Sequence, residues 1–318
     1  RRAHHDHYIG VFSDAAAGER CNRRRGCAGA EDAARQDRQV QSAGRCVLPG
    51  RLHPAVLALC QLGRHGVPWD VSEDATQYTF HLRDSNWSDG SPIKASDFVF
   101  AFQRIVDPKT GAPYSWYLEL AGIVNASEIT KGEKSPDTLG VKALDDKTVQ
   151  ITLTKPVPYF TKMLAHESTF ALPEATVKKY GENWTKPENI VTSSAYTLDT
   201  WVINERVVLK RNPAYWNNDK TVIETVTYLP IQDENAEYNR FRTGEVDITS
   251  TVPLELYKTI KKERPNELLT MPSLGTYYYL FNTSKKPFDD PRVRKALAYS
   301  IDRDIVVNGI LGMGQLPA

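Results

Sequence analysis

Residues 78–98 read Tyr78-Thr-Phe-His-Leu-Arg-Asp-Ser-Asn-Trp-Ser-Asp-Gly-Ser-Pro-Ile-Lys-Ala-Ser-Asp-Phe98 and combine a strand, a turn and the start of a helix. The first six residues alternate apolar and polar side chains, which predicts a half-buried strand. The Ser-Asp-Gly-Ser-Pro segment that follows is typical of a tight turn. Ser96 is expected to cap a helix that carries Phe98 and Phe102 on one face. This succession indicates an α/β fold.

Helices and strands alternate irregularly along the rest of the chain. A hairpin is expected over residues 140–153, around the polar turn Asp145-Asp146-Lys147. Further strands are predicted at residues 206–211, 222–229, 246–249 and 276–282, and helices at 174–180, 234–242, 253–263 and from Pro291 onward. Because there is no steady βαβ repeat and no obvious linker, the domains of this region are expected to be interwoven.

Residues 1–68 differ sharply in composition from the residues that follow. They hold eleven Arg and no Lys, whereas residues 69–318 hold ten Arg and nineteen Lys. They also show no sustained period of 2 or 3.6 residues and are poor in strand formers. We interpret this stretch as aberrant: disordered, or translated out of frame. A genuine basic, cysteine-rich extension and an unrelated fused segment are the alternatives.

Two groups of possible metal ligands lie in this N-terminal stretch. The motif His4-His5-Asp6-His7 has the right side chains for a metal, but a disordered tail is the preferred interpretation. The cysteines could form a zinc site or two disulfides, although their spacing fits no standard zinc pattern; they are Cys21, Cys27, Cys46 and Cys60. No metal and no cofactor is predicted.

The composition argues against several classes of function. A formal net charge of +1 provides no strong field toward nucleic acid or an anionic membrane. The longest apolar runs fall far short of the roughly 20 residues of a membrane helix. After residue 68 the chain has no cysteine and only two histidines, His81 and His166, and it lacks a Gly-x-Ser-x-Gly elbow and a phosphate-binding glycine loop. We therefore predict a protein that is not an enzyme and has no catalytic residue.

Several motifs recur together from residue 78 onward. Residues 78–98 contain a strand, a basic residue, Trp-x-Asp-Gly-x-Pro and a helix entered at Ala-x-Asp-Phe. Further landmarks are Asp107-Pro-Lys-Thr110, Leu139-Gly-Val-Lys-Ala143, Lys155-Pro-Val-Pro-Tyr159, Arg211-Asn-Pro-Ala-Tyr-Trp216, Gly244-Glu-Val-Asp-Ile248, Leu274-Gly-Thr-Tyr-Tyr-Tyr-Leu-Phe-Asn-Thr283, Asp290-Pro-Arg-Val-Arg-Lys-Ala-Leu297 and Ile301-Asp-Arg303. With these landmarks the chain resembles the extracellular solute-binding proteins of oligopeptide importers. Residues 274–283 are most similar to the branch that binds oligopeptides and murein peptides.

The resemblance implies a two-lobed α/β fold of the periplasmic binding protein-like type II, with an extra inserted domain. Residues 69–176 would form the inserted domain of the first lobe, and residues 177–274 the main part of that lobe. Residues 275–318 would begin a second lobe that is truncated, because in this family it continues for about 200 residues beyond the position of Ala318. The carboxylate that pairs with the amino terminus of the peptide would lie there, so this chain is expected to hold one wall of the site.

The resemblance also implies a periplasmic receptor that captures oligopeptides for an ABC-type importer. Its partners would be the peptide and the membrane permease subunits, with a monomeric receptor and no nucleic acid. Candidate peptide contacts are Tyr114, Tyr117, Thr249, Ser250, Gly275, Tyr277 and Tyr278. Strand alternation would place Tyr277 and Tyr279 on one face and Tyr278 on the other, so at least one face is expected to be core. For each residue, ordinary packing is the alternative to peptide contact.

Two alternatives to this function are kept. The chain could be a non-functional fragment, from a pseudogene or a frameshift, or the same fold could bind murein peptides, dipeptides, haem or metal chelates. One departure from the family pattern concerns residues 193–194, where Ser-Ser occupies a place that usually contains glycine. The lost glycine is expected to strain a tight turn.

Overall fold

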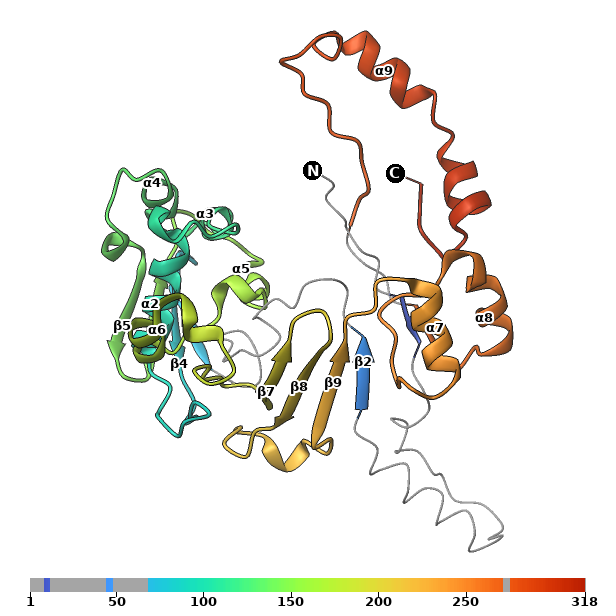
Figure 1. The fold of residues 1–318 in the computed structure, drawn as a ribbon. Helices are drawn as coiled ribbons and strands as arrows, with labels where there is room; N and C mark the ends of the chain where they lie inside the picture. Colours follow the sequence, from blue (N-terminus) through green and yellow to red (C-terminus); the bar gives the residue numbers. More distant parts are fainter. Residues whose placement is uncertain (1–8, 12–43, 48–67, 271–274, 318) are drawn as a thin grey trace, which may run out of the picture. The chain divides into compact units, whose positions relative to one another are not determined.

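The computed structural model of the chain describes residues 9–11, 44–47, 68–270 and 275–317 (Figure 1). The chain divides into two compact units. The central unit comprises residues 51–228. The terminal unit comprises residues 1–50 and 229–318.

A four-stranded antiparallel sheet forms the first layer of the central unit, in the order β3-β4-β6-β5. Its strands are β3 (Trp69–Val71), β4 (Gln77–His81), β5 (Val141–Asp145) and β6 (Thr148–Thr152). In β4 and β6, buried side chains alternate with partly exposed ones, as a sheet with one covered face requires. The strand expected from residue 78 and the hairpin around residues 145–147 are thus confirmed.

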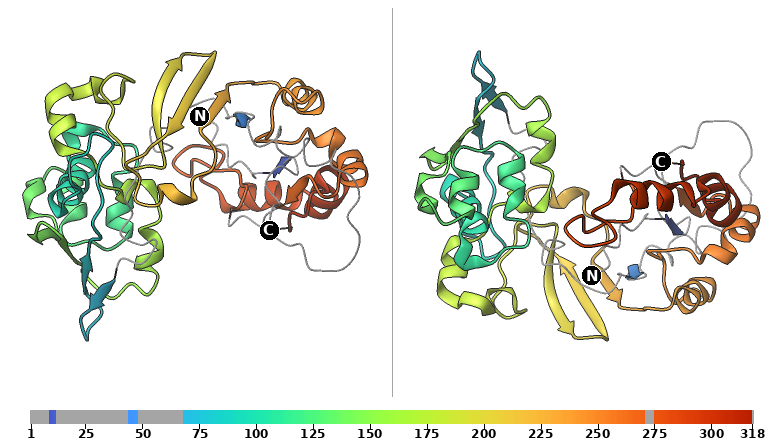
Figure 2. Two further views of the ribbon diagram at one scale, coloured as in Figure 1. Left: turned by 90° about the horizontal axis from the view of Figure 1, so that it is seen from below. Right: turned by 90° about the horizontal axis from the view of Figure 1, so that it is seen from above.

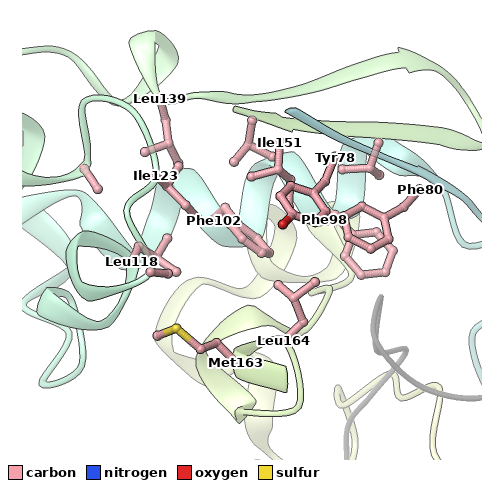
Figure 3. Close-up of a cluster of buried hydrophobic side chains, with 14 of the residues drawn as sticks. Tyr78, Phe80, Phe98, Phe102, Leu118, Ile123, Leu139, Ile151, Met163 and Leu164 are labelled. Atoms are coloured by element: carbon pink, nitrogen blue, oxygen red, sulfur yellow. The ribbon is translucent and has the colours of Figure 1, made fainter. Parts of the chain in front are cut away.

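Helix α2 (Ala95–Val106) packs against β5 and β6 and buries one face. Phe98 and Phe102 have no exposed surface. Figure 3 shows both rings in one cluster with Tyr78 and Ile151 of the sheet. The main hydrophobic core of the central unit therefore lies between α2 and this sheet.

The N-terminus of α2 differs from the sequence prediction. The cap residue is Lys94, not Ser96, and the Asp97 carboxylate accepts a hydrogen bond from the Lys94 backbone N–H at 2.9 Å. A buried acidic residue in the first turn thus takes the capping role, because its carboxylate satisfies an otherwise unpaired N–H and faces the positive end of the helix. Ser96 lies one residue inside the helix and is exposed.

Asp97 also links three segments of the central unit. Its carboxylate accepts hydrogen bonds from Trp87 Nε1 at 3.1 Å and from the Glu174 backbone N–H at 3.4 Å. Burial raises the pKa of Asp97, and the hydrogen bonds from Lys94, Trp87 and Glu174 oppose this shift. The buried hydrogen bond between Trp87 and Asp97 therefore connects the two parts of the motif, Trp-x-Asp-Gly-x-Pro and Ala-x-Asp-Phe.

Short helices complete the covering of this core. They are α3 (Trp116–Leu120), α4 (Ala126–Thr130), α5 (Phe160–Met163) and α6 (Glu174–Tyr180), with short 3₁₀ turns η3 (Pro108–Thr110), η4 (Pro136–Thr138), η5 (Glu167–Thr169) and η6 (Gly181–Thr185) between them. Each of the four helices is too short to be stable alone, so tertiary packing of residues such as Leu118, Ile129 and Phe160 maintains them. The helix predicted at residues 174–180 is confirmed with its stop at Gly181.

A second antiparallel group of strands ends the central unit: β7 (Tyr196–Val202), β8 (Arg206–Arg211) and β9 (Thr225–Leu229). β7 and β8 lie side by side as a hairpin in both views of Figure 2. Leu198, Val207 and Leu209 form its small buried cluster. The prediction for residues 206–211 is confirmed, whereas β9 begins three residues later than predicted and is preceded by η7 (Asn218–Lys220).

Residues 193–194 do not have the strained backbone that the missing glycine suggested. The described non-glycine residues with positive φ are Ala75, Asn125 and Asn204. Instead, Asn212, which is 1% exposed, donates from Nδ2 to the Ser194 carbonyl at 2.8 Å. This asparagine fixes the segment without requiring a left-handed residue, so that expectation was wrong.

The two hydrophobic clusters of the central unit are joined by polar contacts. The Ser88 backbone N–H donates to the Thr192 carbonyl at 2.8 Å, and the Arg83 guanidinium lies 4.1 Å from the ring centroid of Trp216. The larger cluster draws its buried members from residues 78–171 and the smaller one from residues 198–209. The predicted boundary at residues 176–177 lies between these clusters and stays a prediction.

The terminal unit contains the short strand pair β1 (Ile9–Val11) and β10 (Leu268–Thr270), and the helices α7 (Glu234–Arg242), α8 (Tyr257–Glu263) and α9 (Pro291–Tyr299). A 3₁₀ turn η8 (Leu254–Leu256) precedes α8, and a π-helical segment η9 (Ile305–Leu311) follows α9. The buried cluster consists of Tyr238, Phe241, Val246, Val252, Tyr257 and Ile260. Helix α7 has its predicted bounds, because Asp233 caps it through the Ala236 N–H at 2.7 Å and Gly244 follows its end.

Three predictions for the terminal unit were wrong or incomplete. The helix expected at residues 253–263 is divided into η8 and α8. Residues 246–249 and 276–282 form no strand, although Ile248 makes a single β-bridge. A strand requires a neighbouring backbone as well as a suitable pattern of side chains.

The N-terminal stretch contains two short strands that its composition did not predict, β1 and β2 (Gly44–Val47). The motif His4-His5-Asp6-His7 and the cysteines Cys21, Cys27 and Cys60 lie outside the described residues, as does the side chain of Cys46. Among the residues that are described, no helix has the length and apolar character needed to cross a membrane.

Candidate functional site

Two of the candidate residues, Tyr114 and Tyr117, lie at the start of α3 in the central unit. Their rings contact His166: the Tyr117 ring stacks on the imidazole with centroids 4.2 Å apart, and the Tyr114 ring lies 5.1 Å away. Trp116 joins the same group, with its ring centroid 5.8 Å from Tyr114. These four aromatic side chains define what we call the aromatic cluster.

The members of the aromatic cluster differ in burial. Tyr117 is half-buried, donates its hydroxyl to the Met163 carbonyl at 3.0 Å, and has a pKa raised by that burial. Tyr114 and Trp116 are 39% and 49% exposed. Tyr117 therefore anchors the cluster, while the rings of Tyr114 and Trp116 are partly open to solvent. Trp116 was not among the candidate residues, although it lies between the two tyrosines that the resemblance pointed to.

Thr249 and Ser250 lie in the segment between α7 and η8 of the terminal unit. Thr249 is 1% exposed. The Ser250 backbone N–H and hydroxyl both donate to Oε1 of Glu237, at 2.5 and 3.1 Å, and the Thr251 hydroxyl donates to Oε2 at 3.3 Å. Burial raises the pKa of Glu237, and the bonds from Ser250 and Thr251 oppose that shift. Thr249 therefore packs as core, while Ser250 remains partly exposed.

Gly275, Tyr277 and Tyr278 lie in an exposed segment that leads to α9. Figure 1 shows this segment as an orange coil without helix or strand. Tyr277 and Tyr278 are 72% and 65% exposed, and Tyr279 is 70% exposed. The rings of Tyr277 and Tyr279 meet edge to face at 6.3 Å, as side chains two residues apart do in extended backbone. The expectation that one face of this segment is core was wrong, since all three rings face solvent.

The structure thus groups the candidate residues in three places, one in the central unit and two in the terminal unit. Among the described residues, no group of three or more His, Cys, Asp or Glu is placed to hold a metal ion. His81 forms a surface pair with Asp70 at 2.8 Å, and His166 belongs to the aromatic cluster. The chemistry that these places offer is aromatic contact and hydrogen bonding.

Comparison with known proteins defines the class. Residues 67–318 match the family model for bacterial extracellular solute-binding proteins, family 5 Middle. The chain therefore belongs to the bacterial extracellular solute-binding proteins of family 5 and has their type II periplasmic binding protein fold. The match begins where the composition of the sequence changes, near residue 69.

Individual relatives agree with this assignment. The chain is 51% identical over 269 residues to the periplasmic oligopeptide-binding protein OppA of Escherichia coli, covering 82% of this chain and 49% of that protein. It is 46% identical over 248 residues to the periplasmic murein peptide-binding protein MppA of the same organism, covering 78% and 46%. The crystal structure of Haemophilus influenzae OppA in complex with RPPGFSPFR superposes with a TM-score of 0.79 at 38% identity, covering 86% of this chain and 58% of that one. The chain spans about half the length of the curated relatives it matches.

Proposed function

We propose that this chain is the peptide-capturing part of a periplasmic solute-binding receptor that delivers oligopeptides to an ABC-type importer. The observation that carries the proposal is its 51% identity to an oligopeptide-binding protein. The family match over residues 67–318 includes the Leu274–Thr283 stretch with its exposed tyrosines. The receptor acts as a monomer in the periplasm, and its partners are the peptide and the permease subunits. The relatives named above are periplasmic binding proteins, which supports this location and role.

Exposed backbone supports an extended peptide as the ligand. Residues 275–281 make none of the backbone hydrogen bonds found among the described residues, and their side chains are mostly exposed. A peptide can pair its backbone N–H and C=O groups with such a segment, whatever its own side chains are. Tyr277 and Tyr278 then supply broad apolar surfaces on either side of the backbone. Affinity would come from the backbone, and the tyrosines would tolerate different peptide side chains.

Substitution of both exposed tyrosines tests this site. We expect Tyr277→Ser with Tyr278→Ser to raise the dissociation constant for tri-alanine at least about tenfold, because each aromatic contact contributes on the order of 1 kcal/mol. Binding is measured by titrating the isotopically labelled chain and following backbone amide shifts by NMR, which detects dissociation constants up to the millimolar range. The exposed Tyr299→Ser is the matched control, since Tyr299 is 83% exposed on α9 of the same unit.

The control separates a specific effect from a general loss of apolar surface. Tyr299→Ser is expected to leave the dissociation constant unchanged. Equal weakening by both substitutions would contradict a site at Tyr277 and Tyr278. A response to haem or a metal chelate, with none to tri-alanine, would favour the alternative ligand class. No response to any of these ligands would favour the non-functional fragment.

A further inference from the structure

The sequence contains four Asn-x-Ser/Thr motifs without proline at the middle position: Asn86-Trp-Ser88, Asn125-Ala-Ser127, Asn183-Trp-Thr185 and Asn282-Thr-Ser284. This motif is the acceptor for N-linked glycosylation, which attaches a bulky group and therefore needs a surface position. The transferring enzyme has to bind all three residues of the motif together. A motif that is packed into the fold is therefore open to modification only after local unfolding.

Two of the four motifs are held by the fold of the central unit. Trp87, the middle residue of the first motif, is 2% exposed, and the Ser88 hydroxyl accepts the Thr192 backbone N–H at 3.1 Å. In the second motif, Asn125 is half-buried and donates from Nδ2 to the Thr138 carbonyl at 2.6 Å. Both motifs would have to leave these contacts before an enzyme could bind them.

The third motif is held less firmly. It lies in η6, where Asn183 is exposed but Trp184 and Thr185 are half-buried. The Asn183 carbonyl also accepts a hydrogen bond from Nδ2 of Asn189 at 2.9 Å. Access to this motif requires at least the opening of the 3₁₀ turn.

The fourth motif lies between the segment of exposed tyrosines and α9, and its three residues are all exposed. The Ser284 hydroxyl and backbone N–H both donate to Oδ1 of Asn282, at 2.6 and 3.1 Å. Nδ2 of Asn282 has no hydrogen-bond partner among the described residues. The acceptor nitrogen and the hydroxyl of the motif thus lie in one surface turn, and neither has to leave a buried contact.

The hydrogen bond from Ser284 also suits the chemistry of glycosylation. An amide nitrogen is a poor nucleophile because resonance delocalises its lone pair into the carbonyl group. When Nδ2 of Asn282 gives up a proton, negative charge develops on Oδ1. A hydroxyl that donates to Oδ1 stabilises this charge, because hydrogen bonds to charged acceptors are the stronger ones.

We propose that Asn282 is an N-glycosylation site whose donor is a glycosyl diphosphate. A bond forms between Nδ2 of Asn282 and the anomeric carbon of the sugar, and the bond from that carbon to the diphosphate oxygen breaks. The diphosphate leaves with the electron pair, and the Nδ2 proton passes to a base of the transferring enzyme. The donor is a nucleotide sugar or a polyprenyl-diphosphate oligosaccharide. The inference does not depend on peptide capture.

The test compares the folded chain with four synthetic peptides, each of which contains one motif and its neighbouring residues. One arm uses a soluble N-glycosyltransferase with UDP-glucose, and the other uses a membrane oligosaccharyltransferase with a polyprenyl-diphosphate oligosaccharide. Mass spectrometry after proteolysis gives the initial rate at each asparagine, and the added mass distinguishes the two donors. Dividing each rate by that of the matching peptide removes the preference of the enzyme for particular sequences.

Asn282 of the folded chain is expected to react within about twofold of its peptide in at least one arm, because its motif needs no local unfolding. Asn86 and Asn125 should react at least about tenfold more slowly than their peptides, with Asn183 in between. The proposal is overturned if Asn282 is modified in neither arm. It is also overturned if the ratio of chain to peptide at Asn282 is no higher than at Asn86 or Asn125.

Three variants complete the test. Ser284→Thr keeps the hydroxyl and should retain the rate at Asn282 within about twofold, whereas Ser284→Ala should lower it at least about tenfold. Asp97→Ala removes the acceptor of Trp87 Nε1 and should speed modification of Asn86 while leaving Asn282 unchanged. A rate at Asn282 that is unaffected by Ser284→Ala, or one that changes as much as that of Asn86 in Asp97→Ala, would contradict the proposal.

Discussion

Replacing Phe102 by alanine is expected to lower the free energy of unfolding by about 4 kcal/mol. Phe102 has no exposed surface and lies between α2 and the sheet, in the cluster shown in Figure 3. Truncation removes apolar contacts and leaves a cavity that close-packed neighbours such as Ile151 and Leu164 cannot fill. At roughly 3 °C per kcal/mol for a unit of this size, the loss corresponds to a fall of about 12 °C in Tm.

The matched control for Phe102 lies on the same helix. Phe100 is only partly buried, with Lys178 Nζ at 5.9 Å from its ring centroid. Phe100→Ala should cost less, about 2 kcal/mol, because part of the ring stays in contact with water in the folded protein. Urea unfolding followed by tryptophan fluorescence measures both values. Equal losses for the two substitutions would mean that α2 does not bury the face described above.

Asp97→Ala is expected to cost about 3 kcal/mol, although the carboxylate carries a desolvation penalty. The substitution leaves three donors without their acceptor: Trp87 Nε1 and the backbone N–H groups of Lys94 and Glu174. Each buried donor left unpaired costs about 1–3 kcal/mol, and removal of the carboxylate's own desolvation penalty offsets part of this sum. Trp87 is itself 2% exposed, so its Nε1 donor would be left buried without an acceptor.

The control for Asp97 is Asp89, an aspartate in the turn that precedes α2. Asp89 is exposed and accepts the Ser91 backbone N–H at 3.0 Å, so Asp89→Ala should cost less than about 1 kcal/mol. Thermal unfolding of both variants gives the comparison. A loss for Asp97→Ala no larger than that for Asp89→Ala would show that the link between Trp87, α2 and Glu174 contributes nothing to stability.

Elements with strong local signals could be predicted from the sequence. Helix α7 has its predicted bounds because an N-cap aspartate and a terminal glycine mark its two ends. The hairpin of β5 and β6 was predicted because two strand-like segments flank a polar turn. Family membership was also predictable, since its landmarks are spread over most of the chain.

Features that depend on distant partners could not be predicted in this way. The role of Asp97 requires Glu174, which is 77 residues away in the sequence. Ser96 has a residue type that is common at helix caps, but the cap residue is Lys94, whose backbone N–H donates to the buried Asp97 carboxylate. Residues 276–282 have an ideal strand composition and yet form none, because a strand needs a paired backbone.

The candidate site was predicted only in part. The rings of Tyr114 and Tyr117 both contact the imidazole of His166. Nothing in the sequence indicated that His166 would lie between these two tyrosines. Thr249 was a candidate peptide contact, which stays a prediction, and its side chain is 1% exposed. Glu237 was missed altogether, because an isolated glutamate on a polar helix gives no sign that it is buried.

Titration of the labelled chain with tri-alanine tests the central claim most directly. We predict saturable shifts at Tyr277, Tyr278 and Ser250, with weak affinity because this chain spans about half the length of its relatives. Free alanine at the same concentration should produce no such shifts, since it lacks an extended backbone to pair. Absence of saturable shifts with tri-alanine, or equal shifts with free alanine, would contradict peptide capture by this chain.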